Sequence, residues 1–239
     1  MSLFVPARRF DPSAPEMMDR PDADPAILRD DLRNLRTINR FFGGLKAIRR
    51  SVVPLLRKME NGREVQILDL ATGSADHPLE LMTLAERHHR RMHVTAVDRN
   101  PVMIQISRER TADQPNIAVE EKDLLRLDYE PGSFDIVICS LAIHHFSRDD
   151  AVAILRSMSR LSRIGFIVND LSRSWIAAGT ASLYTHLTTR NPMTLCDSYV
   201  SVLRAFTPAE LKQMAVEAGI EKFKIQTRPF FRLLLVGEH

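Results

Sequence analysis

The sequence predicts an α/β fold in which helices cover both faces of a mostly parallel sheet. Two observations lead to this prediction: short apolar runs alternate with segments of helical periodicity, and helix-start signals stand between the runs. Parallel strands need a crossover, usually a helix, so this alternation is typical of a parallel sheet. The apolar runs are VQILDL (65–70), HVTAVD (93–98), NIAVE (116–120), FDIVICS (134–140) and IGFIVND (164–170).

A helical prefix precedes the alternating part of the chain. Residues 1–25 are rich in Pro and Asp and lack periodicity, so we expect them to be ordered only where they pack on other parts. Apolar residues recur at helical spacing over 25–42, and Gly43–Gly44 is expected to end that helix. A basic helix is expected over 45–58, with its charges in solvent or against an anionic membrane.

Helix N-terminal signals mark the starts of the helices between the predicted strands, and one insertion interrupts the alternation of strands and helices. A helical stretch at about 172–204 is longer than a simple crossover needs, and we expect it to form a substrate lid. The last two strands, about 221–227 and 230–236, are expected to pair antiparallel. The domain prediction is an N-terminal extension and helical lid over 1–62, followed by one domain over 63–239. The helix-start signals are Asn100–Pro101, Ser147 with Asp150, and Thr207 with Glu210.

Bulk composition limits the classes of protein and partner. The 239 residues, 44% hydrophobic and 26% charged, are enough for one globular domain with a full core. The 33 basic residues are scattered among 30 acidic ones, which does not favour a nucleic-acid surface. Cys139 and Cys196 lie far apart and outside any CxxC pattern, which fits a reducing compartment. With no apolar run of signal or transmembrane length, we expect a cytoplasmic protein without integral membrane contact.

Acidic residues stand at the ends of the first three predicted strands. They are Asp69, Asp98 and Asp123, and the carboxyl ends of parallel strands form the usual ligand edge of such a sheet. A single acid of this kind is more often a turn former, but three form a pattern. The segment ILDLATGSADHP (67–78) has only one glycine, Gly73, whereas a dinucleotide turn needs several for its pyrophosphate.

A ligand that contains adenosine but no phosphate fits this turn better. S-adenosylmethionine is such a ligand: a carboxylate at Asp98 suits its ribose hydroxyls, and small residues such as Ala71 and Ala75 leave room for its amino-acid tail. Nearby acids also favour its cationic amine and sulfonium.

From about Arg63 onward the chain resembles the class I S-adenosylmethionine-dependent methyltransferases, and it is most similar to small-molecule methyltransferases of the quinone and polyketide type. The resemblance lies in DLATGSA (69–75), Asp98, Lys122–Leu124 and FDIVICSLAIHHF (134–146). The family's first loop usually reads DxGxGxG, and here alanines replace the outer glycines. The resemblance implies a Rossmann-like, doubly wound, seven-stranded, mostly parallel sheet with an antiparallel C-terminal strand and an N-terminal helical lid.

The resemblance also implies which residues hold the cofactor. The first loop cradles its methionine part, Asp98 binds the ribose hydroxyls, and Asp123 with Leu124 recognises the adenine. Arg36, on the prefix helix, is expected to meet the cofactor carboxylate. The full predicted set is Arg36, Asp69, Ala71, Thr72, Gly73, Ser74, Asp98, Arg99, Asp123, Leu124, Ser140 and Leu141.

Three residues are candidates for catalysis on a hydroxyl acceptor. His144 and His145 follow the fourth strand, and a neutral imidazole is available as a general base at pH 7. The alternative is that one histidine caps the next helix and the other packs beside Phe146. Asp170 ends the fifth strand and is expected to bind an acceptor hydroxyl, while Arg173 is expected either to hold a carboxylate or to pair with Asp170.

No metal site is predicted, because His88 and His89 are adjacent on a polar helix without further ligands. The functional prediction is methylation of a hydroxyl, or less favourably a carbon, on a small aromatic, phenolic or polyketide-like molecule. An NAD(P)-dependent oxidoreductase on a similar sheet and a non-catalytic cofactor-binding relative are the alternatives. The sequence leaves the oligomeric state open, with a homodimer among the options.

Overall fold

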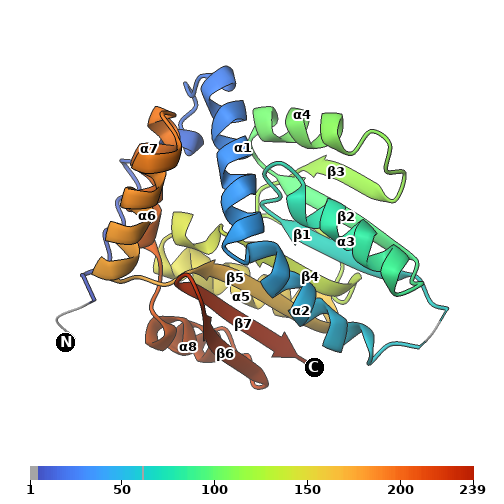
Figure 1. Cartoon of the computed structure of the whole chain (residues 1–239). Coiled ribbons are helices and arrows are strands. Elements are labelled where there is room, and N and C mark those ends of the chain that lie inside the picture. The colour runs from blue at the N-terminus through green and yellow to red at the C-terminus, as the bar shows by residue number, and fades with distance from the viewer. Residues whose placement is uncertain (1–4, 61) are drawn as a thin grey trace.

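The computed structural model describes residues 5–60 and 62–239, and it confirms the predicted α/β architecture (Figure 1). One seven-stranded sheet has the order β3-β2-β1-β4-β5-β7-β6, in which strands β1 to β5 are parallel and β7 is antiparallel to both of its neighbours. The strand order therefore reverses between β1 and β4, where such folds bind ligands. The strands are β1 (Val65–Leu70), β2 (Met92–Asp98), β3 (Ile117–Glu121), β4 (Phe134–Ser140), β5 (Ser162–Leu171), β6 (Phe223–Arg228) and β7 (Arg232–Glu238).

Helices cover both faces because side chains of each strand alternate between two cores. Ile67 of β1 packs in a core with α2 and α3, while Leu68 and Leu70 pack in the opposite core with α5 and α8. The helices are α1 (Pro25–Phe41), α2 (Gly44–Leu56), α3 (Asp76–Arg87), α4 (Pro101–Arg110), α5 (Arg148–Leu161), α6 (Trp175–Thr188), α7 (Pro192–Arg204) and α8 (Pro208–Glu217), with short 3-10 turns η1 (Met17–Asp19) and η2 (Ile143–His145).

The predicted helix signals act as expected at their N-termini. Side chains of Asn100, Ser147 and Thr207 accept backbone N–H bonds at the starts of α4, α5 and α8, and Thr207 with Glu210 forms a complete capping box. Gly43 adopts φ 79° between α1 and α2, whereas Gly44 is already the first residue of α2. The break between the two helices therefore depends on Gly43 alone.

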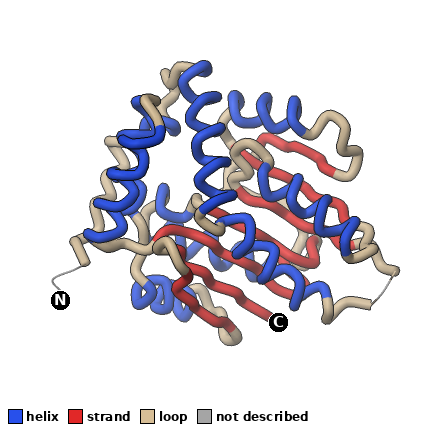
Figure 2. Tube along the Cα trace, viewed as in Figure 1, coloured by secondary structure: helices blue, strands red, loops and turns tan. Residues whose placement is uncertain are grey.

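The N-terminal segment and the insertion lie together beyond the carboxyl edge of the sheet. Helix α1 packs against α4 and α7 through a small apolar cluster that includes Leu28, Leu32, Met103 and Met193. The insertion forms the α6–α7 pair, and Figure 2 shows the N-terminal loop segment running beside it. The N–H of Arg9 donates to the carbonyl of Leu203, so this segment is ordered by packing on α7.

Within residues 5–60 and 62–239, no helix combines the length and the apolarity that crossing a membrane requires.

Candidate active site

The loop after β1 has an unusual backbone. Ala71, Gly73 and Ala75 have φ of 53°, 57° and 57°, in the left-handed region that costs a non-glycine residue about 1 kcal/mol or more. Among the residues that the structure describes, the nearest atom to a Cβ on Gly73 would be Leu32 Cδ2 at 4.0 Å, so conformation rather than space favours glycine there. Strain of this kind persists where the surrounding structure imposes it, and it is common at ligand sites.

Asp98, at the end of β2, holds this loop in place. Its Oδ2 accepts the N–H of Gly73 at 2.9 Å and its Oδ1 accepts the N–H of Asn100 at 3.0 Å. Burial raises the pKa of Asp98, although its backbone hydrogen bonds oppose that rise. A carboxylate has about four acceptor positions, so at least one remains for a ligand beside the backbone N–H groups of Gly73, Arg99 and Asn100.

Asp69, the last acid of β1, lies beneath the loop. It is buried, its Oδ2 has no hydrogen-bond partner within residues 5–60 and 62–239, and burial raises its pKa to about 7. This carboxylate is therefore poised between its neutral and charged forms near neutral pH, and its state depends on nearby charge.

A cavity of about 650 Å³ opens at the carboxyl edge between the first loop, the end of β2 and the loop after β4. This volume lies within the usual range for small-molecule sites. The predicted cofactor residues that line it are Ala71, Thr72, Gly73, Ser74, Asp98, Arg99, Leu124, Ser140 and Leu141.

Three predicted cofactor residues, Asp69, Asp123 and Arg36, are outside that lining set. Asp123 accepts the N–H of Leu125 at 2.9 Å and so shapes the turn that presents Leu124 to the cavity. Arg36 Nε lies 3.4 Å from Asp76 Oδ1, and Arg110 also pairs with that carboxylate.

His144 and Asp170 form a buried pair at the end of the sheet. Nδ1 of His144 lies 2.6 Å from Oδ1 of Asp170, and the backbone N–H of His144 donates to Oδ2 at 3.2 Å. Burial opposes ionisation of Asp170, but His144 outweighs it and holds the carboxyl pKa below its usual value. The carboxylate therefore stabilises the tautomer with a proton on Nδ1, and Nε2 is left as the available atom.

His145 pairs with acids from the N-terminal segment. Its Nδ1 lies 2.6 Å from Asp19 Oδ2 and 3.8 Å from Glu16 Oε1. Burial lowers the pKa of His145, but Glu16 and Asp19 together raise it to about 9. The expected neutral imidazole at pH 7 is therefore wrong for His145. The alternative role as a helix cap is also wrong for both histidines, because Ser147 caps α5.

The predicted pairing of Arg173 with Asp170 is wrong. Arg173 donates to Glu210 at 2.6 Å and to the carbonyl of Ala205 at 2.6 Å, so it ties β5 to the start of α8. Its Nε donates to the carbonyl of Pro6 at 2.9 Å, which also fastens the N-terminal segment. Glutamate at the third position of α8 is already oriented by its capping box, and this makes it the better partner.

A second cavity of about 320 Å³ adjoins the first and has a mostly apolar wall. It lies between α1, the α6–α7 pair and the turn between β6 and β7. Both His144 and His145 line it, and Leu141 and His145 line both cavities. The two cavities therefore meet at Leu141 and His145.

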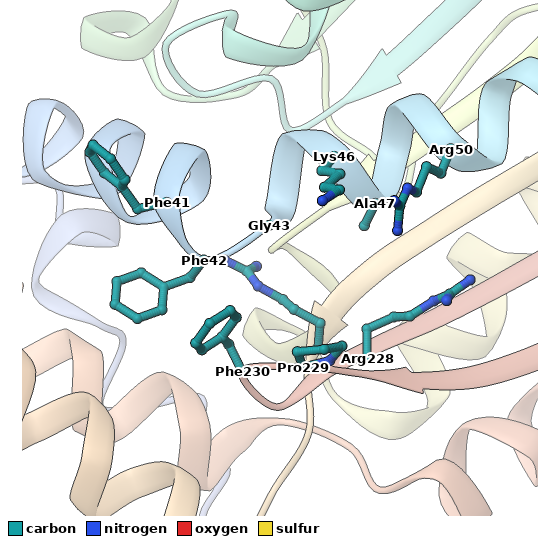
Figure 3. Close-up of a pocket in the computed structure, with 10 residues that line it drawn as sticks. Phe41, Phe42, Gly43, Lys46, Ala47, Arg50, Arg228, Pro229 and Phe230 are labelled. Carbon is teal, nitrogen blue, oxygen red and sulfur yellow. The ribbon is translucent and has the colours of Figure 1, made fainter.

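Aromatic side chains enclose one end of this second cavity. Phe42 makes edge-to-face contacts with Tyr184 and Phe230, with ring centroids 4.7 and 4.9 Å apart. Figure 3 shows Phe42 and Phe230 beside a third, smaller cavity of about 190 Å³, which Lys46 and Arg228 also line. Phe42 and Phe230 thus stand between the second cavity and a smaller one that has basic side chains in its lining.

Sequence reasoning missed Glu16 and Asp19. Both stand in a segment without periodicity, and each contacts a histidine more than a hundred residues further along the chain. No spacing rule connects such distant positions, so only the folded chain shows that the two acids belong to the site.

Fold, site and comparisons together support a class I S-adenosylmethionine-dependent methyltransferase. Residues 67–165 match a family model described as a methyltransferase domain. A demethylmenaquinone methyltransferase of Deinococcus radiodurans is 35% identical over 83 residues, which are 34% of this chain and 33% of that protein. The chain therefore matches about a third of the length of this curated relative.

Solved structures show the same fold at low identity. A SAM-dependent methyltransferase from Aquifex aeolicus aligns with a TM-score of 0.58 and 13% identity over 96% of this chain and 98% of that one. The CMeT domain of the citrinin polyketide synthase aligns with a TM-score of 0.62 and 13% identity, over 81% of this chain and 52% of that one. A structure described as PigF with SAH aligns with a TM-score of 0.61 and 16% identity, over 94% of this chain and 62% of that one.

S-adenosylmethionine is the cofactor of this class, and the first cavity fits it. Its wall offers a free acceptor position of Asp98 on one side and the apolar Leu124 and Leu125 on another. The unpartnered Oδ2 of Asp69 beneath the loop adds negative charge that suits a cationic ligand.

Proposed function

We propose that the protein transfers the methyl group of S-adenosylmethionine to a hydroxyl of a small aromatic, phenolic or polyketide-like molecule. One observation carries the proposal: the loop-lined cavity and the apolar cavity meet at Leu141 and His145. A cofactor in the first cavity and an acceptor in the second share a boundary there. The similarity to a quinone methyltransferase and to a polyketide-synthase methyltransferase domain supports this acceptor class.

In the proposed complex, residues 71–74 hold the methionine part of the cofactor and Asp98 binds its ribose hydroxyls. The adenine lies against Leu124, in the turn that Asp123 shapes. The contact of Arg36 with the cofactor carboxylate stays a prediction, and it requires Arg36 to leave Asp76.

Methyl transfer from a sulfonium is an in-line displacement in which positive charge disappears, so alignment of the two reactants supplies much of the catalysis. We propose that His144 also helps to remove the acceptor proton, because Asp170 leaves Nε2 of His144 available and His144 lines the apolar cavity. General-base assistance is typically worth about 10²- to 10⁴-fold. A hydroxyl and an acidic carbon both lose a proton on methylation, so this base serves either acceptor atom.

Calorimetry with S-adenosylhomocysteine is the first test, followed by transfer of a labelled methyl group to a panel of phenols and quinols. We expect binding, and a labelled product with at least one acceptor that has an apolar substituent. Absence of cofactor binding contradicts the proposal, whereas stabilisation by NAD(P) alone indicates an oxidoreductase. Binding without any product over the whole panel indicates a non-catalytic relative.

We also propose a cytoplasmic location, because both cysteines, Cys139 and Cys196, are free thiols. The proposed partner is the small-molecule acceptor, and neither nucleic acid nor an integral membrane anchor is part of the proposal.

A further inference from the structure

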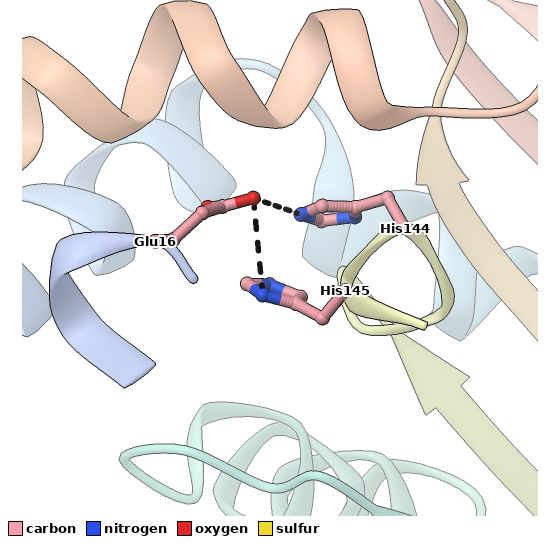
Figure 4. Close-up of side chains that lie close together, drawn as sticks. All are labelled: Glu16, His144 and His145. Atoms are coloured by element: carbon pink, nitrogen blue, oxygen red, sulfur yellow. Dashed lines mark ion pairs between the residues drawn. The ribbon is translucent and has the colours of Figure 1, made fainter. Parts of the chain in front are cut away.

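Glu16, His144 and His145 place three potential metal-ligand atoms around one small space (Figure 4). Oε1 of Glu16 lies 3.9 Å from Nε2 of His144 and 3.8 Å from Nδ1 of His145, and all three atoms lie within 4.8 Å of one another. These separations are too long for hydrogen bonds. The three atoms therefore face one another without bonding directly.

The carboxylate of Glu16 is the strongest indication of a ligand in this space. Its side chain is 0% exposed, and its Oε2 accepts the hydroxyl of Ser201 at 2.5 Å. Its Oε1 has no hydrogen-bond partner in the described part of the chain, and even the guanidinium of Arg204 stays 3.7 Å away. A buried carboxylate oxygen that has only distant ion pairs and no hydrogen bond is under-satisfied, which costs about 1–3 kcal/mol, so direct coordination of a cation at this point is favourable.

His144 is held as metal-binding histidines usually are. Metal-bound imidazoles generally donate their second ring N–H to a carboxylate, which fixes the ring and its tautomer. Asp170 does this for His144 and leaves Nε2 directed at Glu16. Nδ1 of His145 shares a proton with Asp19 at 2.6 Å, and an ion replaces that proton when it binds.

We propose that Glu16, His144 and His145 bind one divalent transition-metal ion of the Zn²⁺ type, with Asp19 as an additional oxygen ligand. Two imidazole nitrogens and a carboxylate oxygen form a donor set typical of catalytic zinc. At zinc bond lengths a tetrahedral ion places neighbouring ligand atoms about 3.3 Å apart. The two carboxylate–imidazole separations therefore need to close by about half an ångström, whereas the two imidazole nitrogens, which lie within 4.8 Å of each other, need to close by up to about 1.5 Å.

The role of this ion rests on the proposed methyltransferase function, but its binding does not. Both histidines line the apolar cavity, so an open coordination position there is accessible to an acceptor hydroxyl. A bound divalent ion lowers the pKa of a coordinated hydroxyl, whose proton then leaves to water. The oxygen forms the new O–CH₃ bond as the S–CH₃ bond breaks and S-adenosylhomocysteine departs. The ion then takes over the proposed base function of His144.

Metal analysis of the full chain tests the proposal. The protein is stripped with a chelator, incubated with Zn²⁺ in one sample and Co²⁺ in another, dialysed, and measured by mass spectrometry for metal content. We expect one ion per chain, and a visible Co²⁺ spectrum typical of four or five nitrogen and oxygen ligands. The expected loss of affinity is at least about 100-fold for Glu16→Gln and about 10- to 100-fold for Asp170→Asn.

Matched variants at exposed positions serve as controls. Glu86→Gln removes a carboxylate and His186→Asn removes an imidazole from an exposed position. Both variant proteins are expected to keep the ion. Cys196→Ser is expected to keep it as well, which excludes capture by the exposed thiol. Retention of full metal content in Glu16→Gln contradicts the proposal.

Two further measurements keep the test decisive. If Glu16→Gln does not fold, the Co²⁺ spectrum of the parent decides, because a weak spectrum of a hydrated ion overturns the proposal. Failure to bind either metal overturns it too. Calorimetry with S-adenosylhomocysteine on the stripped protein is separate from these readouts, so the failure of metal binding and the failure of the methyltransferase proposal are distinguishable.

Discussion

At the scale of single residues, Asp98 connects the first loop to the end of β2 and also faces the cofactor cavity. Asp98→Ala removes the charged acceptor that holds the first loop and that faces the cavity. Each hydrogen bond to such a group is worth about 1.5–3 kcal/mol. We therefore expect the Kd for S-adenosylhomocysteine to rise by about 100-fold or more in calorimetry. Asp128→Ala removes an exposed acid that pairs with Lys122 and is the control. A Kd within about threefold of the parent contradicts the assignment of Asp98.

In the proposed mechanism Asp170 acts on the acceptor through His144, so its replacement is expected to separate turnover from cofactor binding. Asp170→Asn keeps the size of the side chain but places an amide where the imidazole N–H meets a carboxylate. We expect kcat to fall by about 100-fold in the methyl-transfer assay, while the Kd for S-adenosylhomocysteine stays unchanged. Equal losses in both quantities would indicate a merely structural role.

At the scale of elements, β5 and β7 approach closely where Phe166 pairs with Gly237. A Cβ at Gly237 would overlap the ring of the buried Phe166, so Gly237→Ala is expected to destabilise the fold by about 1–3 kcal/mol in urea unfolding. Gly179→Ala on α6 is the control, because among the described residues nothing lies within 4 Å of its Cβ, and better helix propensity predicts about 0.5–1 kcal/mol of stabilisation. Equal effects of the two changes would show that packing against Phe166 is not responsible.

The elements also show what the sequence can and cannot predict. The strands and helix starts were predicted because hydrophobic period and capping residues are local signals, and β1 matches its apolar run from Val65 to Leu70. The partner of Arg173 was predicted wrongly because Asp170 is near in sequence, whereas Glu210 is near only in the folded chain. Glu16 and Asp19 were missed for the same reason. Local patterns thus define the scaffold, and long-range contacts complete the site.

At the scale of the whole molecule, two buried groups near the first loop have opposite effects on stability as the pH changes. Burial lowers the pKa of His77 to about 4, so between pH 6.5 and 4 the unfolded chain binds a proton that the folded chain does not. Stability from His77 is therefore lost as the pH falls. Burial raises the pKa of Asp69 to about 7, so the folded chain binds a proton first and this contribution grows as the pH falls.

Single variants separate these two contributions, which nearly cancel in the parent. We compare the free energy of unfolding of each variant with that of the parent at pH 6 and at pH 5. As the pH falls from 6 to 5, the value for His77→Gln minus that for the parent is expected to rise by about 1 kcal/mol. The same difference for Asp69→Asn is expected to fall by a similar amount, because the variant cannot take up the stabilising proton. Urea unfolding at both pH values measures each difference. The contributions of all other titrating groups cancel, because parent and variant share those groups. Parallel stability curves for parent and variants would mean that neither group titrates differently in the folded and unfolded chain.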